Sequence, residues 1–130
     1  LDFLTTPATK VKHLDQAIAK FIDQLSAEFS DLTFVLFGSR SRGQHQPYAD
    51  LDIGVFCATG LVHKTYLTLR KAAARHGDDL PIFFDLVNLN GADQEFLKNI
   101  SLDLKFLSGK REDWLKLKER CIHGKEIKAS

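Results

Sequence analysis

The chain has 130 residues, 44% of them hydrophobic, and its 18 basic and 17 acidic residues leave a formal net charge of +1. This length allows one hydrophobic core and not two, so we expect a single domain over residues 1–130. The near-neutral charge excludes a general attraction to nucleic acid or to a membrane surface. Two cysteines without metal or disulfide spacing are typical of the cytoplasm, and no apolar run approaches the length of a membrane span.

The first predicted element is a helix over residues 7–29. Thr6 and Pro7 supply an N-cap and a first-turn proline. No secretory signal precedes this helix, and the absence of Met at position 1 predicts that the natural start is missing or replaced. Apolar residues recur along one side of the helix at the spacing of a buried stripe: Val11, Leu14, Ile18, Phe21, Ile22, Leu25 and Phe29.

Two predicted strands, residues 33–37 and 51–56, flank a loop that carries the clearest chemical signal. Gly38-Ser39 opens a short helix, whose N–H groups and dipole favour an anion such as phosphate. Asp50 and Asp52 stand at i and i+2, so their side chains point to the same face and repel each other. A cation between them relieves this repulsion, and oxygen-only ligands suit Mg²⁺. The segment therefore predicts a nucleotide site.

A helix over residues 61–76 is predicted to stop at Gly77, and residues 81–89 are predicted to form a buried strand. Asp85 is the single charge in that strand. An unpaired carboxylate is costly to bury. We therefore expect Asp85 to join the same site, as a metal ligand or as the base for an attacking hydroxyl.

Three further elements complete the chain: a helix over 93–100 capped by Asp93, an edge strand over 102–107 and a helix over about 110–122. The fold class is α/β, with a mixed sheet flanked by helices. The last helix is expected to bury one side, made of Trp114, Leu117, Cys121 and Ile122. The core is also expected to hold Phe83, Phe84, Phe96 and Phe106. Ten Phe in so short a chain leave room for an exposed apolar patch that binds a partner.

These motifs carry a family resemblance. GSRSRG from residue 38, DLD from residue 50 and the later FFDLV resemble the DNA polymerase β-like nucleotidyltransferase superfamily, specifically its minimal nucleotidyltransferase branch. The similarity covers a core of about residues 30–110 and preserves spacing as well as residue type. It implies a polymerase β-like palm fold and two Mg²⁺ ions. The implied reaction transfers a nucleoside monophosphate from an NTP to a hydroxyl.

The resemblance also implies roles for individual residues. Gly38 and Ser39 would hold the triphosphate, Asp50 and Asp52 the metal ions, and Asp85 the metal and the nucleophile.

Other residues of the loop keep two interpretations. Arg40 and Arg42 either contact phosphate or pair with surface acids, since exposed ion pairs carry little information. Tyr48 either stacks on a base or closes the loop, and loop closure is favoured because proline-containing turns are common without any ligand.

The acceptor must come from elsewhere, because the chain after the predicted core holds little beyond one strand and one helix. The resemblance implies a helical HEPN ribonuclease toxin as partner, with AMP placed from ATP on a toxin tyrosine. The leading hypothesis is therefore a cytoplasmic protein adenylyltransferase antitoxin. Neutralisation by binding alone and transfer to a small molecule or RNA end are the alternatives, and the preferred NTP and the oligomeric state stay open.

Overall fold

The computed structural model describes residues 7–43 and 46–123, with side chains from residue 13; Thr6 and the side chain of Val11 fall outside these limits. The helix and strand bounds in chain order are α1 (Pro7–Glu28), β1 (Thr33–Phe37), α2 (Ser39–Arg42), β2 (Leu51–Phe56), α3 (His63–His76), β3 (Phe84–Asn88), α4 (Gln94–Ile100), β4 (Lys105–Ser108) and α5 (Arg111–His123). Asp93 caps α4, since its side chain accepts a hydrogen bond from the Phe96 N–H at 2.8 Å.

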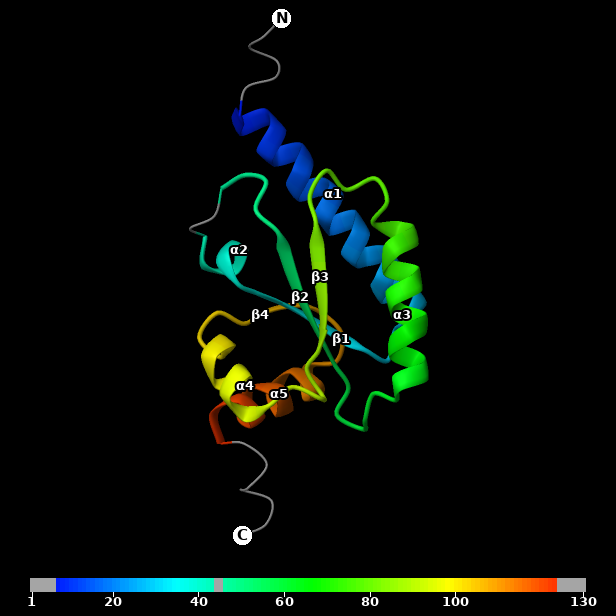
Figure 1. The fold of residues 1–130 in the computed structure, drawn as a ribbon, viewed down its shortest axis with the longest axis vertical. Coiled ribbons are helices and arrows are strands. Elements are labelled where there is room, and N and C mark those ends of the chain that lie inside the picture. The colour runs from blue at the N-terminus through cyan, green and yellow to red at the C-terminus, as the bar shows by residue number, and fades with distance from the viewer. Residues whose placement is uncertain (1–6, 44–45, 124–130) are drawn as a thin grey trace, which may run out of the picture.

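The four strands form one mixed sheet in the order β3-β2-β1-β4 (Figure 1). β1 is antiparallel to both of its neighbours, whereas β2 and β3 are parallel and are connected through α3. The predicted α/β class with a mixed sheet is confirmed. β1 and β2 are central, and β3 and β4 form the edges.

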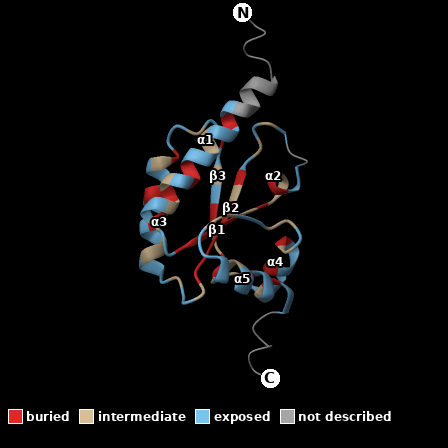
Figure 2. Cartoon of the chain, turned by 180° about the vertical axis from the view of Figure 1, so that it is seen from behind, coloured by how far each residue is buried: buried red, intermediate tan, exposed pale blue. Residues whose placement is uncertain are grey.

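Helices cover both faces of this sheet, α1 and α3 on one and α4 and α5 on the other (Figure 1). Buried residues concentrate on the strands between the two layers, and the outer helix surfaces are exposed (Figure 2). Along β2, Leu51 and Ile53 belong to the core under α1 and α3, whereas Phe56 belongs to the core under α4 and α5. Because side chains alternate along a strand, Asp52 faces the α4 and α5 side.

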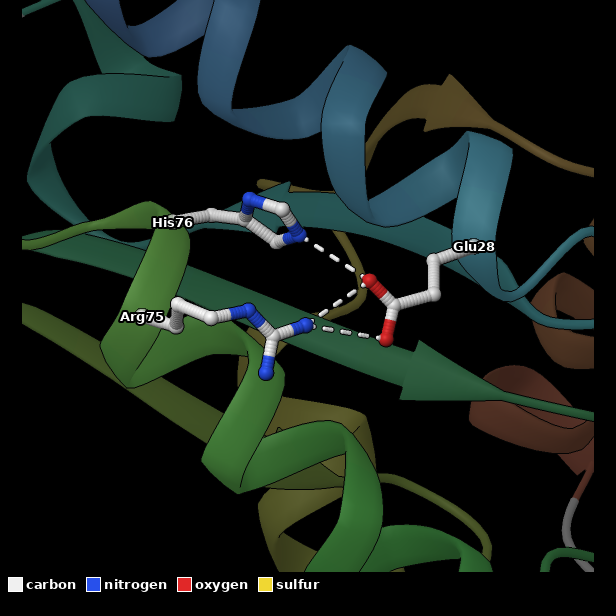
Figure 3. A network of polar contacts seen from close by, with 3 residues as sticks. All are labelled: Glu28, Arg75 and His76. Atoms are coloured by element: carbon white, nitrogen blue, oxygen red, sulfur yellow. Dashed lines mark hydrogen bonds and ion pairs between the residues drawn. The ribbon is translucent and has the colours of Figure 1, made fainter.

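The layer of α1 and α3 is also held by a polar contact at their C-terminal ends. Figure 3 shows the Glu28 carboxylate between Arg75 and His76, at 3.0 Å from a nitrogen of each. His76 and Arg75 lower the pKa of Glu28, with the hydrogen bond from His76 as the largest cause. Arg75 and Glu28 are exposed, so this contact adds little to the stability of the fold.

Two strand predictions need correction. The third strand is shorter than predicted and lies at an edge, and Asp85 on it is exposed. Because β3 is an edge strand, the Asp85 side chain reaches solvent. The need of a buried carboxylate for a metal partner therefore does not apply to Asp85. The fourth strand begins at Lys105 and not at residue 102, because the Asp103 N–H turns back to the Ile100 carbonyl at 2.9 Å.

Three apolar side chains expected in the core are exposed: Phe83 at 83%, Ile122 at 65% and Phe106 at 43%. Phe84, Phe96 and Trp114 are partly buried against the two cores, as predicted. Phe83 lies just before the edge strand, where no helix covers it. Its hydrophobicity alone does not predict this exposure.

Candidate active site

Strand register brings the separate carboxylates of the sequence to one end of the sheet. Asp52 is the parallel partner of Asp85 across β2 and β3. On its other side, Asp52 pairs with Phe37, the last residue of β1, so the Gly38 turn follows directly beside it. Asp50 stands just before β2 on the same end. The antiparallel β1 ends where the parallel β2 and β3 begin, and this topology makes the site.

Gly38 lies directly against the Asp52 carboxylate. Its backbone has φ +81° and ψ −163°, a conformation that L side chains rarely adopt. A Cβ at this position would come within 2.2 Å of Asp52 Oδ2. Glycine thus permits both the turn from β1 into α2 and the close approach of the carboxylate.

The Asp52 carboxylate lies near two other carboxylates, those of Asp85 and Asp50. Burial is the main cause that raises its pKa, and the neighbouring charges of Asp85 and then Asp50 raise it further. Arg42 acts in the opposite direction. The carboxylates are therefore close enough to repel, and a bound cation would offset this repulsion.

The donor chemistry of this site suits a hard divalent cation. Asp50, Asp52 and Asp85 offer only oxygen atoms, as Mg²⁺ prefers. Within residues 7–43 and 46–123, however, no group of three or more His, Cys, Asp or Glu side chains is gathered closely enough to hold a metal ion. The strands make the three carboxylates neighbours, and their side chains are not gathered around one point.

The structure gives Arg40 a contact that its sequence position did not suggest. Its side chain is 8% exposed, and its Nε donates to the Ala49 carbonyl at 3.1 Å while Nη2 donates to the Pro47 carbonyl. Burial lowers the pKa of the guanidinium, which the charge of Asp15 partly counteracts. Arg40 therefore holds the segment that leads into Asp50.

Ser41 and Asp103, which the sequence did not single out, connect α2 to the segment before β4. The buried Ser41 hydroxyl donates to the Asp103 carbonyl, and Arg42 Nη1 lies 2.9 Å from Asp103 Oδ2. Arg42 thus forms the surface ion pair that was one of its two interpretations. Ser41 and Asp103 are 62 positions apart, and no local pattern announces such a contact.

The arrangement of the strands is that of a nucleotidyltransferase. A family model described as polymerase beta, nucleotidyltransferase, matches residues 19–113. This is most of the chain, so the chain belongs to that family and is a nucleotidyltransferase domain.

Solved structures give the same fold. A toxin–antitoxin complex with AMP-PNP has 25% identity, a TM-score of 0.62 and coverage of 85% of this chain and 90% of the other. A substituted form of the toxin–antitoxin pair MntA-HpeT has 26% identity, a TM-score of 0.61 and coverage of 85% and 87%. The tri-AMPylated Shewanella oneidensis HEPN toxin in complex with its MNT antitoxin has 24% identity, a TM-score of 0.60 and coverage of 89% and 90%.

The resemblance to minimal nucleotidyltransferases is confirmed by the family model and by the match to the MntA-HpeT pair. A search of curated proteins finds no match. Among the helices in the described part of the chain, none is both long enough and apolar enough to cross a membrane.

Proposed function

We propose that this chain is a Mg²⁺-dependent protein adenylyltransferase that moves AMP from ATP to a tyrosine hydroxyl of a HEPN ribonuclease toxin, and so acts as a cytoplasmic antitoxin. Membership of the nucleotidyltransferase family supports the reaction class. The complexes with AMP-PNP and with a tri-AMPylated HEPN toxin support the nucleotide and the kind of acceptor.

The observation that carries the proposal is the position of Asp52, which pairs with Asp85 in register and touches the Gly38 turn. In the proposed arrangement, Asp50 and Asp52 would bind the metal ions. Asp85 would bind metal and act on the attacking hydroxyl. Gly38 and Ser39 lie beside the triphosphate, because a backbone without a Cβ allows phosphate to approach closely. Arg42 stands near enough to Asp52 to contribute positive charge.

The reaction is an in-line displacement at the α-phosphorus. The acceptor hydroxyl oxygen forms the new bond to phosphorus, the bond to the bridging oxygen breaks, and pyrophosphate leaves. The Asp85 carboxylate, exposed on the edge strand, would take the hydroxyl proton. Mg²⁺ held by Asp50 and Asp52 would supply positive charge to offset the negative charge of the transferred phosphate. The Arg40 hydrogen bonds keep Asp50 in place while this happens.

Intact-mass spectrometry tests the proposal directly. A HEPN-family protein is incubated with this chain, Mg²⁺ and each NTP in turn. We expect the partner to gain mass in steps of AMP with ATP, and tandem mass spectrometry to place the group on tyrosine. The double variant Asp50→Ala/Asp52→Ala should give no gain. An unchanged partner mass with the wild-type chain would refute the transferase proposal.

Neutralisation by binding alone is the second candidate, favoured by the lack of a gathered three-ligand metal site among the described residues. The two candidates differ in their dependence on Asp52. Under the transferase proposal, Asp52→Ala loses protection of cells that express the toxin, whereas a pure binder keeps it.

A further inference from the structure

A groove lies at the end of the sheet where the carboxylates gather, on the side of α3, and plays no part in the proposed transfer. It has a volume of about 490 Å³ and lies between the end of α3 and the start of β3. We call it the Phe83 groove; its lining includes Gly77, Leu80, Pro81, Phe83 and Phe84. Apart from Asp78, its lining residues carry no charge.

Phe83 is the most unusual residue of this groove. Its side chain is 83% exposed, although it stands two positions before Asp85. Its backbone is fixed, because the Leu51 N–H donates to the Phe83 carbonyl at 2.9 Å. A large aromatic ring on a fixed backbone loses little entropy on binding, and aromatic residues dominate the energetics of protein interfaces.

The apolar surface continues from β3 toward β2. Tyr48, 54% exposed, and Pro81 line a second hollow together with residues of α1. Pro81 belongs to both hollows, so they adjoin. The segments that enter β2 and β3 lie at the same end of the sheet (Figure 1). They therefore present one surface beside the carboxylates.

The charge of these two segments is of one sign. Residues 46–50 and 77–85 contain four charged side chains, all of them carboxylates: Asp50, Asp78, Asp79 and Asp85. Asp78 lines the groove itself. Metal ions would neutralise the site carboxylates, but Asp78 would keep the groove acidic. Such a surface repels a polyanion and attracts a basic segment.

We propose that the Phe83 groove docks the segment of the acceptor protein that carries the hydroxyl, through an apolar side chain against Phe83 and a Lys or Arg opposite Asp78. This proposal rests on the proposed function and specifies how that site selects its acceptor. Docking here brings the acceptor residue toward Asp85, because Phe83 stands two positions before Asp85, at the end of the sheet where β3 begins. The acidic rim selects a protein over an RNA end.

Steady-state transfer and binding to the same HEPN-family protein test this assignment. Phe83→Ala should raise the KM for the acceptor about tenfold, the loss of one interface anchor, with kcat within about twofold. Asp78→Lys should also raise that KM, and it should slow association most at low salt. The matched control is Val62→Ala, an apolar residue that is 66% exposed and precedes α3 at the other end of β2.

Three results would overturn the docking assignment. The first is an unchanged acceptor KM in both variants. The second is weaker binding of AMP-PNP by Phe83→Ala with an unaltered acceptor KM, which would assign the ring to the nucleotide. The third is that the wild-type chain does not bind this acceptor at all.

Nucleotide-free titration separates this proposal from the proposed function. If the wild-type chain binds the acceptor and transfers nothing, the transferase proposal fails. The docking assignment is then decided by whether Phe83→Ala weakens the measured affinity about tenfold.

Discussion

Gly38 shows how a single residue can set the geometry of this site. Its positive φ and the 2.2 Å that would separate a Cβ from Asp52 Oδ2 are two separate demands on the same position. The first concerns backbone strain, which lowers stability wherever it occurs. The second concerns only the Asp52 carboxylate, which can rotate away from an added methyl group. A substitution therefore affects folding and ligand binding by different routes.

Gly38→Ala and Gly43→Ala separate these routes. Gly43 also has a positive φ, +73°, but open space where its Cβ would stand. We expect each variant to lose about 1–3 kcal/mol of unfolding free energy in urea titrations. Only Gly38→Ala should lose binding of AMP-PNP with Mg²⁺, because only there is the carboxylate displaced. Equal nucleotide affinity in the two variants would contradict the role assigned to Gly38.

The raised pKa of Asp52 predicts a pH-dependent effect on stability. A carboxyl group whose pKa is higher in the folded than in the unfolded state favours folding most when protonated, and this advantage is lost as the pH rises through the folded-state pKa. Asp52→Asn should therefore raise the melting temperature at pH 7 in metal-free buffer. The difference should shrink as the pH falls toward the ordinary value of 3.8.

Thermal melts with EDTA and with Mg²⁺ check this prediction. Mg²⁺ should stabilise the wild-type chain more than Asp52→Asn, since it offsets the repulsion that the variant lacks. Asp23→Asn, at an exposed position on α1, is the control and should follow the wild-type chain in both buffers. A lower melting temperature for Asp52→Asn in EDTA at pH 7 would argue against repulsion at this site.

At the scale of elements, the four-residue helix α2 depends on contacts to distant segments. Arg40 attaches it to the entry of β2, and Ser41 and Arg42 attach it to Asp103 before β4. So short a helix is not stable alone. The position of Gly38 and Ser39 therefore depends on the side chains of the residues that follow them in α2.

Ser41→Ala and Asp103→Asn distinguish the two contacts to Asp103. Ser41→Ala removes a buried hydroxyl and leaves the Asp103 carbonyl without this donor, at a cost of about 1–3 kcal/mol. Asp103→Asn keeps the carbonyl and weakens only the surface ion pair with Arg42, at a cost of about 0–1 kcal/mol. Urea denaturation should show this order. The reverse order would mean that the ion pair, and not the hydroxyl, holds α2.

At the scale of the whole molecule, one sheet separates two hydrophobic layers. Leu25 is fully buried in the core under α1 and α3, and Leu117 is fully buried in the core under α4 and α5. Because β1 and β2 contribute to both layers, loss of one layer removes support from the other. We therefore expect a single cooperative unfolding transition.

Trp114 makes this cooperativity measurable, because it is the single tryptophan and lies on α5. Leu25→Ala should destabilise the chain by about 2–5 kcal/mol. The shift in urea midpoint should be the same by Trp114 fluorescence and by far-ultraviolet circular dichroism, although Leu25 is in the opposite layer. A fluorescence midpoint that stays in place while the dichroism midpoint falls would show that the layers unfold separately.

The sequence by itself determined the type and order of the secondary elements and the α/β class, and it proposed the residues of the candidate site. Helical periodicity, the glycine after a strand and two carboxylates at i and i+2 are local patterns, and local patterns can be read along the chain. The tight turn at Gly38 and the capping of α4 by Asp93 are cases where backbone chemistry leaves little choice.

Tertiary structure alone decided which of these residues meet. The register of β2 with β3 places Asp85 beside Asp52, and the edge position of β3 leaves Asp85 and Phe83 exposed, where the apolar sequence predicted burial. The tertiary structure also places the Arg40 side chain against the loop carbonyls and brings Ser41 into contact with Asp103. These outcomes depend on strand order and on contacts between distant segments, and hydrophobicity along the chain carries no information about either.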